Sequence, residues 1–396
     1  MRNQKEIVLA APVRAPIGKF GGCLSSMSAP QLGMIAAKET MRRAGIETKL
    51  INEVIFGNAR QAGVGPNPAR QIAHGSGCPD AVPAYTINKA CASGMKAIVS
   101  AYQAIALGDA AVVLAGGTES MSNTPYFLPR ARWGYRLGHA ELVDGMYRDG
   151  FLCPLCQEVM GSTAENLAEK YGITRKECDE FALMSQQRAK AAHSKNLFAD
   201  EIVPVEISDK KGTKIQVDSD EHPRPGSTLE GLGKLKPVFK ENGVVHAGNA
   251  SGITDGAASV LVLAKEKCAE LGVKPVARIL DYTVAGVDPS IMGIGPVPAI
   301  RNLLARNQLQ LADIDLIELN EAFAVQVLAC DRELHFDLEK VNINGGAIAL
   351  GHPIGCTGCR IVVTLLHEML RRDVNLGLAT LCVSGGMGMT LLLQRV

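Results

Sequence analysis

Cys91 has the sequence surroundings of a nucleophilic cysteine. It lies where a strand-like segment, residues 84–88, gives way to a helical pattern over residues 95–107. Free N–H groups and the dipole at the start of a helix favour a thiolate over a thiol, so Cys91 is a candidate nucleophile. A small buried residue at a tight turn is the alternative interpretation, because cysteine is often buried.

His352 lies in a glycine-rich stretch, residues 344–360, which contains five glycines and one proline. So much glycine lets a backbone approach a ligand closely, at an entropic cost that a purely structural loop rarely needs. We therefore expect this loop to hold His352 as a general base over Cys91 and Cys382. A histidine that is merely hydrogen-bonded within its own loop is the alternative.

Two further candidates follow apolar, strand-like runs. Cys382 ends one of them, and core packing is the alternative for its thiol. Asn320 follows another and precedes a helix, where it is either an N-cap or a polar group directed into a site. In open α/β sheets, ligands gather outside the carboxyl ends of the strands. We therefore expect one pocket to be shared by Cys91, His352, Asn320 and Cys382.

The elements that must position these residues occur twice along the chain. Short apolar strands alternate with amphipathic helices, which indicates parallel strands with helices on the faces of the sheet. The strand, helix, strand order is found at residues 84–88, 95–107 and 111–115, and again at residues 341–344, 357–371 and 378–383. This repetition predicts a duplicated α/β core, although residue identity between the halves is weak.

The first half differs from the second by an insertion of roughly residues 122–249. The strand at 389–393 follows Gly385 and Gly386 at once, whereas its counterpart at 259–263 comes far beyond Gly117. The insertion contains an aromatic segment, a polar region predicted to form two helices broken at Gly172, and a charged loop or hairpin. Such an arm usually covers a site or meets another subunit.

Composition restricts the class of protein. The chain has 396 residues, of which 47% are hydrophobic, 20% charged and 4% aromatic, as in a globular protein with an aliphatic core. A net charge of +1 suggests neither a nucleic acid nor an anionic membrane as partner. We expect no signal peptide and no membrane span, because the apolar runs are too short. Eleven cysteines favour reduced thiols in the cytoplasm.

Two C-x-x-C pairs leave other chemistry open. They are Cys153 with Cys156, in the insertion, and Cys356 with Cys359, at the start of a helix. Both pairs together would be needed for a structural zinc site, and either alone could act in redox chemistry. A zinc-bound or redox-regulated scaffold therefore remains an alternative to a cysteine–histidine enzyme.

Four motifs resemble those of the thiolase family, in the family's order and at its usual separations. They are NKACASGMKA at 88–97, NEAF at 320–323, GHPIG at 351–355 and CVSGGMG at 382–388. The likeness runs from residues 14–18 to the last strand and is closest to the biosynthetic, short-chain branch. It implies a reversible Claisen condensation of two acetyl-CoA to acetoacetyl-CoA and CoA. A 3-ketoacyl-CoA thiolase for longer chains and a non-catalytic acyl-CoA-binding relative are the alternatives.

The resemblance implies a role for each site residue. Cys91 becomes acetylated, His352 takes its proton, and Cys382 removes the α-proton of the second substrate. Asn320 holds a water that stabilises the enolate oxygen together with His352. The backbone N–H groups of Cys91 and Ser384 bind the other oxyanion, although the family commonly has glycine where this chain has Ser384.

The resemblance also implies the substrate contacts and the assembly. CoA-binding and acyl-pocket positions are Ser251, Ala250, Phe239, Met160, Met292, Ala322 and Phe323. No metal or redox cofactor is implied, since acetyl-CoA, acetoacetyl-CoA and CoA are the partners, and a homotetramer is expected.

The implied fold is a thiolase-like duplicated α/β/α layered core, with two similar halves of mixed sheets and an inserted loop domain. The boundaries we expect are 1–121 with 250–271 for the first half, 122–249 for the loop domain and 272–396 for the second half.

Overall fold

The computed structural model describes residues 5–208 and 212–396, and its main feature is a large mixed sheet. The strand order is β14-β15-β16-β13-β1-β12-β5-β3-β4, with β2 paired to β12. The strands are β1 (Ile7–Arg14), β2 (Gly18–Lys19), β3 (Glu53–Gly57), β4 (Ala84–Ile87), β5 (Val112–Ser120), β12 (Thr254–Ala264), β13 (Pro275–Gly286), β14 (Leu316–Leu319), β15 (Leu376–Val383) and β16 (Met387–Arg395).

The two halves of the sheet repeat one pattern. The order β1-β12-β5-β3 in the first half matches β13-β16-β15-β14 in the second. In each half two antiparallel pairings are followed by one parallel pairing. The halves join where β1 and β13 pair antiparallel, with Leu9 opposite Ala277. The predicted duplicated core with mixed sheets is therefore confirmed.

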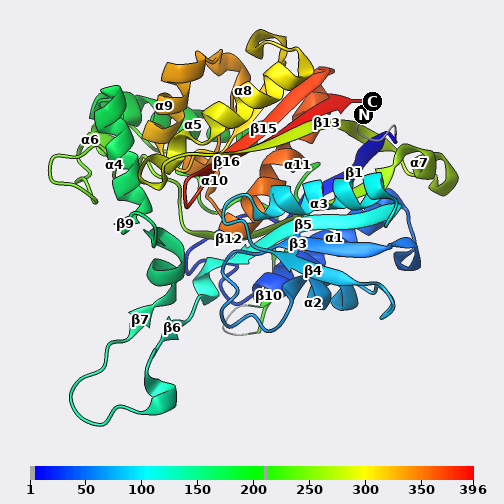
Figure 1. The fold of residues 1–396 in the computed structure, drawn as a ribbon, viewed down its shortest axis with the longest axis horizontal. Helices are drawn as coiled ribbons and strands as arrows, with labels where there is room; N and C mark the ends of the chain where they lie inside the picture. Colours follow the sequence, from blue (N-terminus) through cyan, green and yellow to red (C-terminus); the bar gives the residue numbers. More distant parts are fainter. Residues whose placement is uncertain (1–4, 209–211) are drawn as a thin grey trace.

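Helices lie in three layers around the two halves of the sheet (Figure 1). The main ones are α1 (Ala29–Ala44), α2 (Pro68–Gly75), α3 (Ser93–Leu107), α8 (Pro296–Asn307), α9 (Ala324–Leu334) and α11 (Ile354–Arg372). Alternate residues of a strand point to opposite faces of a sheet. Accordingly, Val113 of β5 packs with α3 and α11, whereas Leu114 packs with α1 and α2. On β16, Leu391 faces α3 and α11, and Leu392 faces α8 and α9.

Glycines bring α3 and α11 unusually close in the middle layer. A Cβ added to Gly94 would lie 2.7 Å from the backbone nitrogen of Cys359. A Cβ on Gly358 would lie 2.5 Å from the backbone nitrogen of Met95. No side chain fits at either position without a shift of backbone. This contact places the start of α3, and hence Cys91, beside the loop that carries His352.

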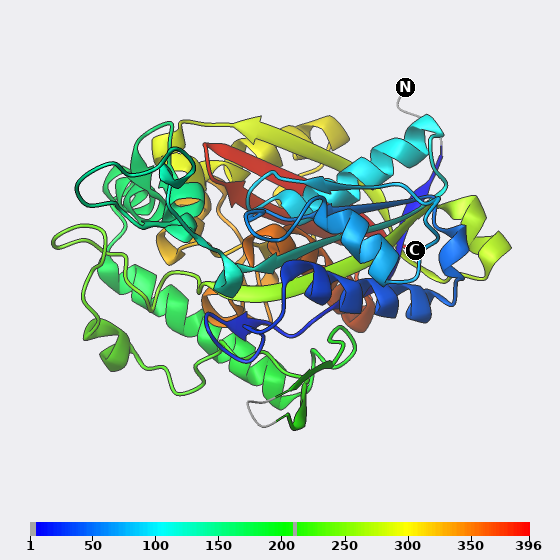
Figure 2. The ribbon, with the colours of Figure 1, turned by 90° about the horizontal axis from the view of Figure 1, so that it is seen from below.

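Within the described residues, the segment between β5 and β12 forms three short strand pairs and three α-helices. They are β6 (Tyr126–Phe127) with β7 (Val143–Asp144), β8 (Leu152–Cys153) with β9 (Glu158–Val159), α4 (Met160–Tyr171), α5 (Arg175–Ser194), β10 (Val205–Ser208) with β11 (Lys214–Val217), and α6 (Leu229–Gly233). Gly172 ends α4 with φ +61°, as predicted. The β6–β7 arm projects from the body in Figure 1, and Figure 2 shows α5 along one side.

Two local predictions were wrong. The predicted strand at 341–344 is reduced to one parallel bridge between Val341 and Ile317. Asn342 adopts φ +46°, and its side-chain amide bonds both the N–H and the carbonyl of Leu319, at 2.8 and 2.7 Å. That side chain takes the place of a strand ladder. α11 also begins earlier than predicted, at Ile354, directly after Pro353.

No helix within residues 5–208 and 212–396 is long and apolar enough to cross a membrane.

Candidate active site

Cys91 lies in a tight turn between β4 and α3. The preceding residue, Ala90, has φ +46°, which is unusual for a residue with a Cβ. The hydroxyl of Ser93 holds the turn by accepting from the N–H of Lys89 at 2.8 Å and donating to the carbonyl of Ala90 at 2.7 Å. The turn therefore presents a half-buried thiol at the start of a helix, where the sequence placed it.

Burial raises the pKa of the Cys91 thiol. N–H donors from Ser384 and from Cys91 itself, together with the positive charge of Arg60, act in the opposite direction, and Glu119 adds to the rise. The net direction is upward. Our expectation that the helix start would favour the thiolate was wrong, because the loss of solvent outweighs the donors. The thiol therefore needs a base to become a nucleophile.

The hydrogen bonds around His352 determine which ring nitrogen can act as that base. Nδ1 lies 2.6 Å from Oγ1 of Thr357, and the hydroxyl of Thr357 donates to the carbonyl of Pro353 at 2.9 Å. The single hydroxyl hydrogen is thus used, so Nδ1 carries the ring proton and donates it to Thr357. Nε2 is then an acceptor; it is buried and has no hydrogen-bond partner among the described residues.

His352 is neutral over the working pH range. Burial, with the charges of Arg360 and Arg60, lowers its pKa to about 3. Its backbone N–H donates to the carbonyl of Gly252 at 3.0 Å, and Gly351 before it has φ +103°. A neutral imidazole with an unpaired, buried Nε2 can accept a proton from a thiol nearby.

Cys382 is fully buried near the end of β15. Burial raises the pKa of its thiol well above the ordinary value, and the nearby Cys91 raises it further. Two residues later, Ser384 gives its N–H to the sulfur of Cys91. The structure therefore brings Cys91 and Cys382 to one place from opposite halves of the sheet.

Asn320 follows β14 and is fully buried. Neither atom of its side-chain amide has a partner among the described residues, and the N-cap of α9 is Phe323. The N-cap interpretation is therefore wrong. The N–H of Asn320 donates to the carbonyl of Thr380 at 3.0 Å, which ties it to the strand of Cys382. A buried, unpaired amide is costly, so a polar partner from a substrate or a water suits this position.

The predicted substrate-contact residues gather around Cys382. Met160, Met292 and Ala322 pack with Cys382 in one apolar cluster, and Phe323 lies against it. The N–H of Ser251 donates to the carbonyl of Ala322 at 3.0 Å, and Ala250 forms a bridge with Phe323. The ring of Phe239 lies so close to Gly161, the residue after Met160, that a Cβ there would meet it at 2.3 Å.

A pocket of about 690 Å³ opens beside this cluster. Its walls include Ser384, Gly385, Cys153, Leu155 and Arg148. Ser384 is not among the non-glycine residues with positive φ, so its Cβ is compatible with the turn that directs its N–H to Cys91.

Three residues near the site were not found from the sequence. Thr357 orients His352 as described above. Glu119 is buried and accepts N–H groups from Arg60 at 3.1 Å and from Gly355 at 2.8 Å, which connects the loop after β3 to the histidine loop. Arg60 is 7% exposed, and its Nε has no partner among the described residues.

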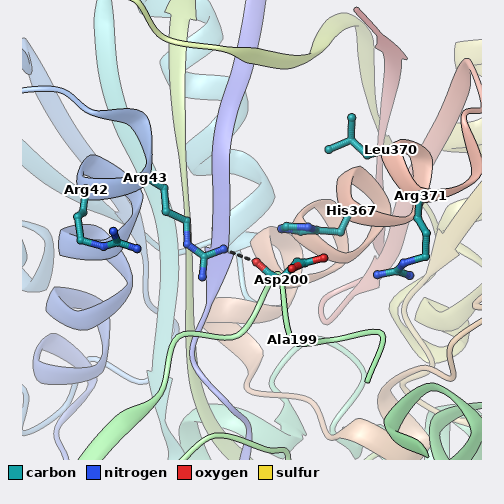
Figure 3. A pocket seen from close by; sticks show the side chains of 7 residues that line it. All are labelled: Arg42, Arg43, Ala199, Asp200, His367, Leu370 and Arg371. Atoms are coloured by element: carbon teal, nitrogen blue, oxygen red, sulfur yellow. Dashed lines mark hydrogen bonds between the residues drawn. The ribbon is translucent and has the colours of Figure 1, made fainter. Parts of the chain in front are cut away.

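A second pocket, of about 570 Å³, contains none of the predicted residues (Figure 3). It lies between α1, α11 and the Ala199–Asp200 segment. Arg43 donates to the carbonyl of Asp200, and Arg371 donates to Glu368 and to the carbonyl of Leu197. These guanidinium groups attach the segment to the two helices. Within the described residues, no group of three or more His, Cys, Asp and Glu side chains is arranged to hold a metal ion.

Comparison with known proteins agrees with this architecture. Models of the thiolase N-terminal and C-terminal domains match residues 7–266 and 273–395. The acetyl-CoA acetyltransferase of Pseudomonas aeruginosa is 52% identical over 391 residues, which is 99% of this chain and all of that protein. The crystal structure of the Bacillus anthracis acetyl-CoA acetyltransferase is 47% identical with a TM-score of 0.97, and each chain is fully covered. Human mitochondrial 3-ketoacyl-CoA thiolase, in its complex with CoA, is 44% identical with a TM-score of 0.95, over 99% of this chain and 98% of the other. The chain belongs to the thiolase family.

Proposed function

We propose that the chain is an acetyl-CoA C-acetyltransferase, which condenses two acetyl-CoA to acetoacetyl-CoA and CoA in a reversible reaction. One observation carries the proposal: Cys91 lies close enough to Cys382 to raise the pKa of the Cys382 thiol, and the charge of Arg60 acts on both Cys91 and His352, whose buried Nε2 is unpaired. The family membership and the relatives named above support the acetyl-CoA substrate.

The first half-reaction acetylates Cys91. Nε2 of His352 takes the thiol proton while the sulfur attacks the thioester carbonyl. The N–H groups of Cys91 and Ser384 receive the developing oxyanion, and in a comparable site one such donor is worth about 2.7–4 kcal/mol. The C–S bond to CoA then breaks, and the CoA thiolate takes the proton from His352.

The second half-reaction forms the carbon–carbon bond. Cys382 first loses its thiol proton to solvent. Its thiolate, a strong base because burial raises the pKa of its thiol, then removes an α-proton from the second acetyl-CoA. The amide of Asn320, through a water, stabilises the enolate oxygen, and His352 shares in this only while Nε2 carries a proton. The enolate attacks acetyl-Cys91, and the released Cys91 thiolate regains a proton from Cys382.

Two variants separate these steps. Cys91→Ala should take up no radiolabelled acetyl from acetyl-CoA, and retained label on the folded variant would reject Cys91 as the nucleophile. Cys382→Ser should still be acetylated, but should exchange the α-protons of acetyl-CoA slowly. If the unaltered protein binds CoA thioesters but takes up no acetyl label, the non-catalytic alternative is indicated.

The apolar wall of Met160, Met292 and Ala322 beside Cys382 favours short acyl groups. The alternative, a 3-ketoacyl-CoA thiolase, predicts a longer range of acyl chains, and the human relative is named as such a thiolase. Thiolysis of acetoacetyl-CoA, 3-ketohexanoyl-CoA and 3-ketodecanoyl-CoA, measured side by side, distinguishes the two. Highest kcat/KM on the ten-carbon substrate would overturn the short-chain assignment.

We further propose a homotetramer in the cytoplasm. The projecting β6–β7 arm exposes large apolar side chains, with Trp133 at 85% and Leu137 at 99% exposure, which suits a surface buried by another subunit. All eleven cysteines are free, which suits a reducing compartment. Native mass spectrometry tests the assembly, and a variant with Trp133 and Leu137 changed to Ser should lose tetramer.

A further inference from the structure

The C-x-x-C pair of the insertion lies at the catalytic pocket. Cys153 ends β8 and pairs with Glu158 of β9, and the turn between them is closed by the N–H of Gln157 on the carbonyl of Cys153 at 2.9 Å. The side chain of Cys153 packs with Cys382, and Cys156 lies against the same apolar cluster. The mechanism above uses neither thiol.

The groups around Cys153 stabilise the thiolate form of its side chain. Its sulfur is within hydrogen-bond reach of the N–H groups of Cys156, Leu155 and Gly385, and of the Cys156 thiol. Burial opposes these donors, yet the net effect lowers the pKa of Cys153. The pKa of Cys156 is raised, first by burial and then by Cys153 itself. One thiol of the pair is thus prepared to attack, and its neighbour keeps its proton.

Access comes through the pocket rather than through the outer surface. Cys153 is only 2% exposed, but it forms part of the wall of the 690 Å³ pocket with Arg148 and Ser384. A small oxidant can therefore reach the sulfur from the space that leads to the active site.

The pair is joined to the nucleophile by two successive peptide groups. Ser384 gives its N–H to the sulfur of Cys91, and Gly385 gives its N–H to the sulfur of Cys153. Gly385 and Gly386 have φ of +85° and +81°, so this turn has a definite shape. Any change of charge at Cys153 therefore acts on the turn that supplies an oxyanion donor to Cys91.

We infer that Cys153 and Cys156 form an oxidisable thiol pair that adjusts the Ser384–Gly385 turn, separate from the catalytic cysteines. The Cys153 thiolate attacks hydrogen peroxide, which breaks the O–O bond and leaves a sulfenic acid and, after protonation, water. The Cys156 thiol then displaces the second oxygen as water and closes the disulfide. With a small disulfide as oxidant, Cys153 first forms a mixed disulfide, and Cys156 releases the second thiol. Oxidation removes the anion from the Gly385 N–H and slows acetylation of Cys91. This consequence rests on the proposed function, whereas the thiol chemistry does not.

Peptide masses test the inference without any activity assay. The native full chain is treated with hydrogen peroxide or glutathione disulfide, blocked with N-ethylmaleimide and cleaved after Lys and Arg. Both thiols fall in the single peptide of residues 149–170. A disulfide there appears as loss of two hydrogens from one peptide, whereas a Cys91–Cys382 disulfide would join two peptides.

The variants assign each step. Cys156→Ser should trap glutathione on Cys153, and Cys153→Ser should leave Cys156 blocked by maleimide under the same oxidant. Cys23 packs in a different apolar cluster from the pair, so Cys23→Ser should behave as the unaltered chain. Two maleimide labels on peptide 149–170 would show that both thiols of the pair stayed reduced. If Cys23 or Cys91 is oxidised while the pair stays reduced in this way, the inference is overturned. If the disulfide forms and Cys91 is acetylated at an unchanged rate, the coupling through the Ser384–Gly385 turn is overturned.

Discussion

Nδ1 of His352 lies 2.6 Å from Oγ1 of Thr357, and this contact leaves Nε2 as the only ring nitrogen able to accept a proton. Thr357 lies in the first turn of α11 and is fully buried. Its hydroxyl oxygen, which accepts from Nδ1–H, is therefore held in a fixed position. The tautomer of the base is thus set by a hydroxyl rather than by the carboxylate found in many catalytic triads.

Thr357→Val should keep the shape of the side chain and lose the acceptor for Nδ1–H. We expect the rate of Cys91 acetylation to fall on the order of 10- to 100-fold, a range typical of residues that orient a reacting group. Stopped-flow measurement of acetyl transfer checks this. Thr357→Ser, which keeps the hydroxyl, should retain most of the rate, and equal rates for Val and Ser would refute the role.

Arg60→Leu should raise the pKa of Cys91 further, because the charge of Arg60 lowers it in the native chain. The rate at which iodoacetamide alkylates Cys91 is measured as a function of pH. The midpoint of this profile should lie at a higher pH in Arg60→Leu than in the unaltered protein. Arg60→Lys keeps a positive charge and should stay near the native midpoint. Coincident profiles for Leu and the native chain would show that Arg60 only fills space.

Glu318 should make stability depend on pH. Burial raises its pKa to about 8, against the lowering effect of Arg360, whose Nη1 lies 3.2 Å from the carboxyl group. The folded chain then holds this proton more tightly than the unfolded chain, whose glutamate titrates near about 4.3. The contribution to stability is complete below that pH and is lost as the pH rises towards about 8.

Glu318→Gln removes this titration, so its free energy of unfolding should fall less than that of the native chain between about pH 5 and 8. Urea unfolding at several pH values measures the difference. Glu230→Gln, at an 80% exposed side chain paired with Lys234, serves as the surface control. Parallel curves for the native chain and Glu318→Gln would contradict the prediction.

Gly94→Ala should destabilise the middle layer, since the new Cβ would lie 2.7 Å from the backbone of Cys359. Overpacking of a rigid contact costs about 1–3 kcal/mol, so the midpoint of urea unfolding should drop. Gly226→Ala is the matched control, because nothing lies within 4 Å of its added Cβ. An unaltered midpoint for Gly94→Ala would mean that α3 and α11 are free to separate.

The sequence predicted what local patterns determine. The helix end at Gly172 follows from glycine's ease in the left-handed conformation, and its φ is +61°. The order of strands and helices was enough to expect Cys91 and Cys382 at one edge of the duplicated sheet. Predictions failed where tertiary surroundings decide, since the pKa of Cys91 depends on burial.

Other features had no local pattern at all. Glu119 meets the histidine loop across 236 positions of chain, and Arg60 reaches the site only because β3 ends there. The side chain of Asn342 replaces a strand ladder, which no apolar run could reveal.

The antiparallel contact of β1 with β13 makes each half an incomplete molecule. A chain cut near Gly272 would yield two fragments, one with Cys91 and one with His352 and Cys382, each with a bare strand edge at the cut interface. Neither piece alone holds a full set of reacting groups. When the two fragments are mixed, acetyl transfer should return only as fast as β1 pairs with β13. The rate at which activity recovers therefore measures the rate at which the halves associate.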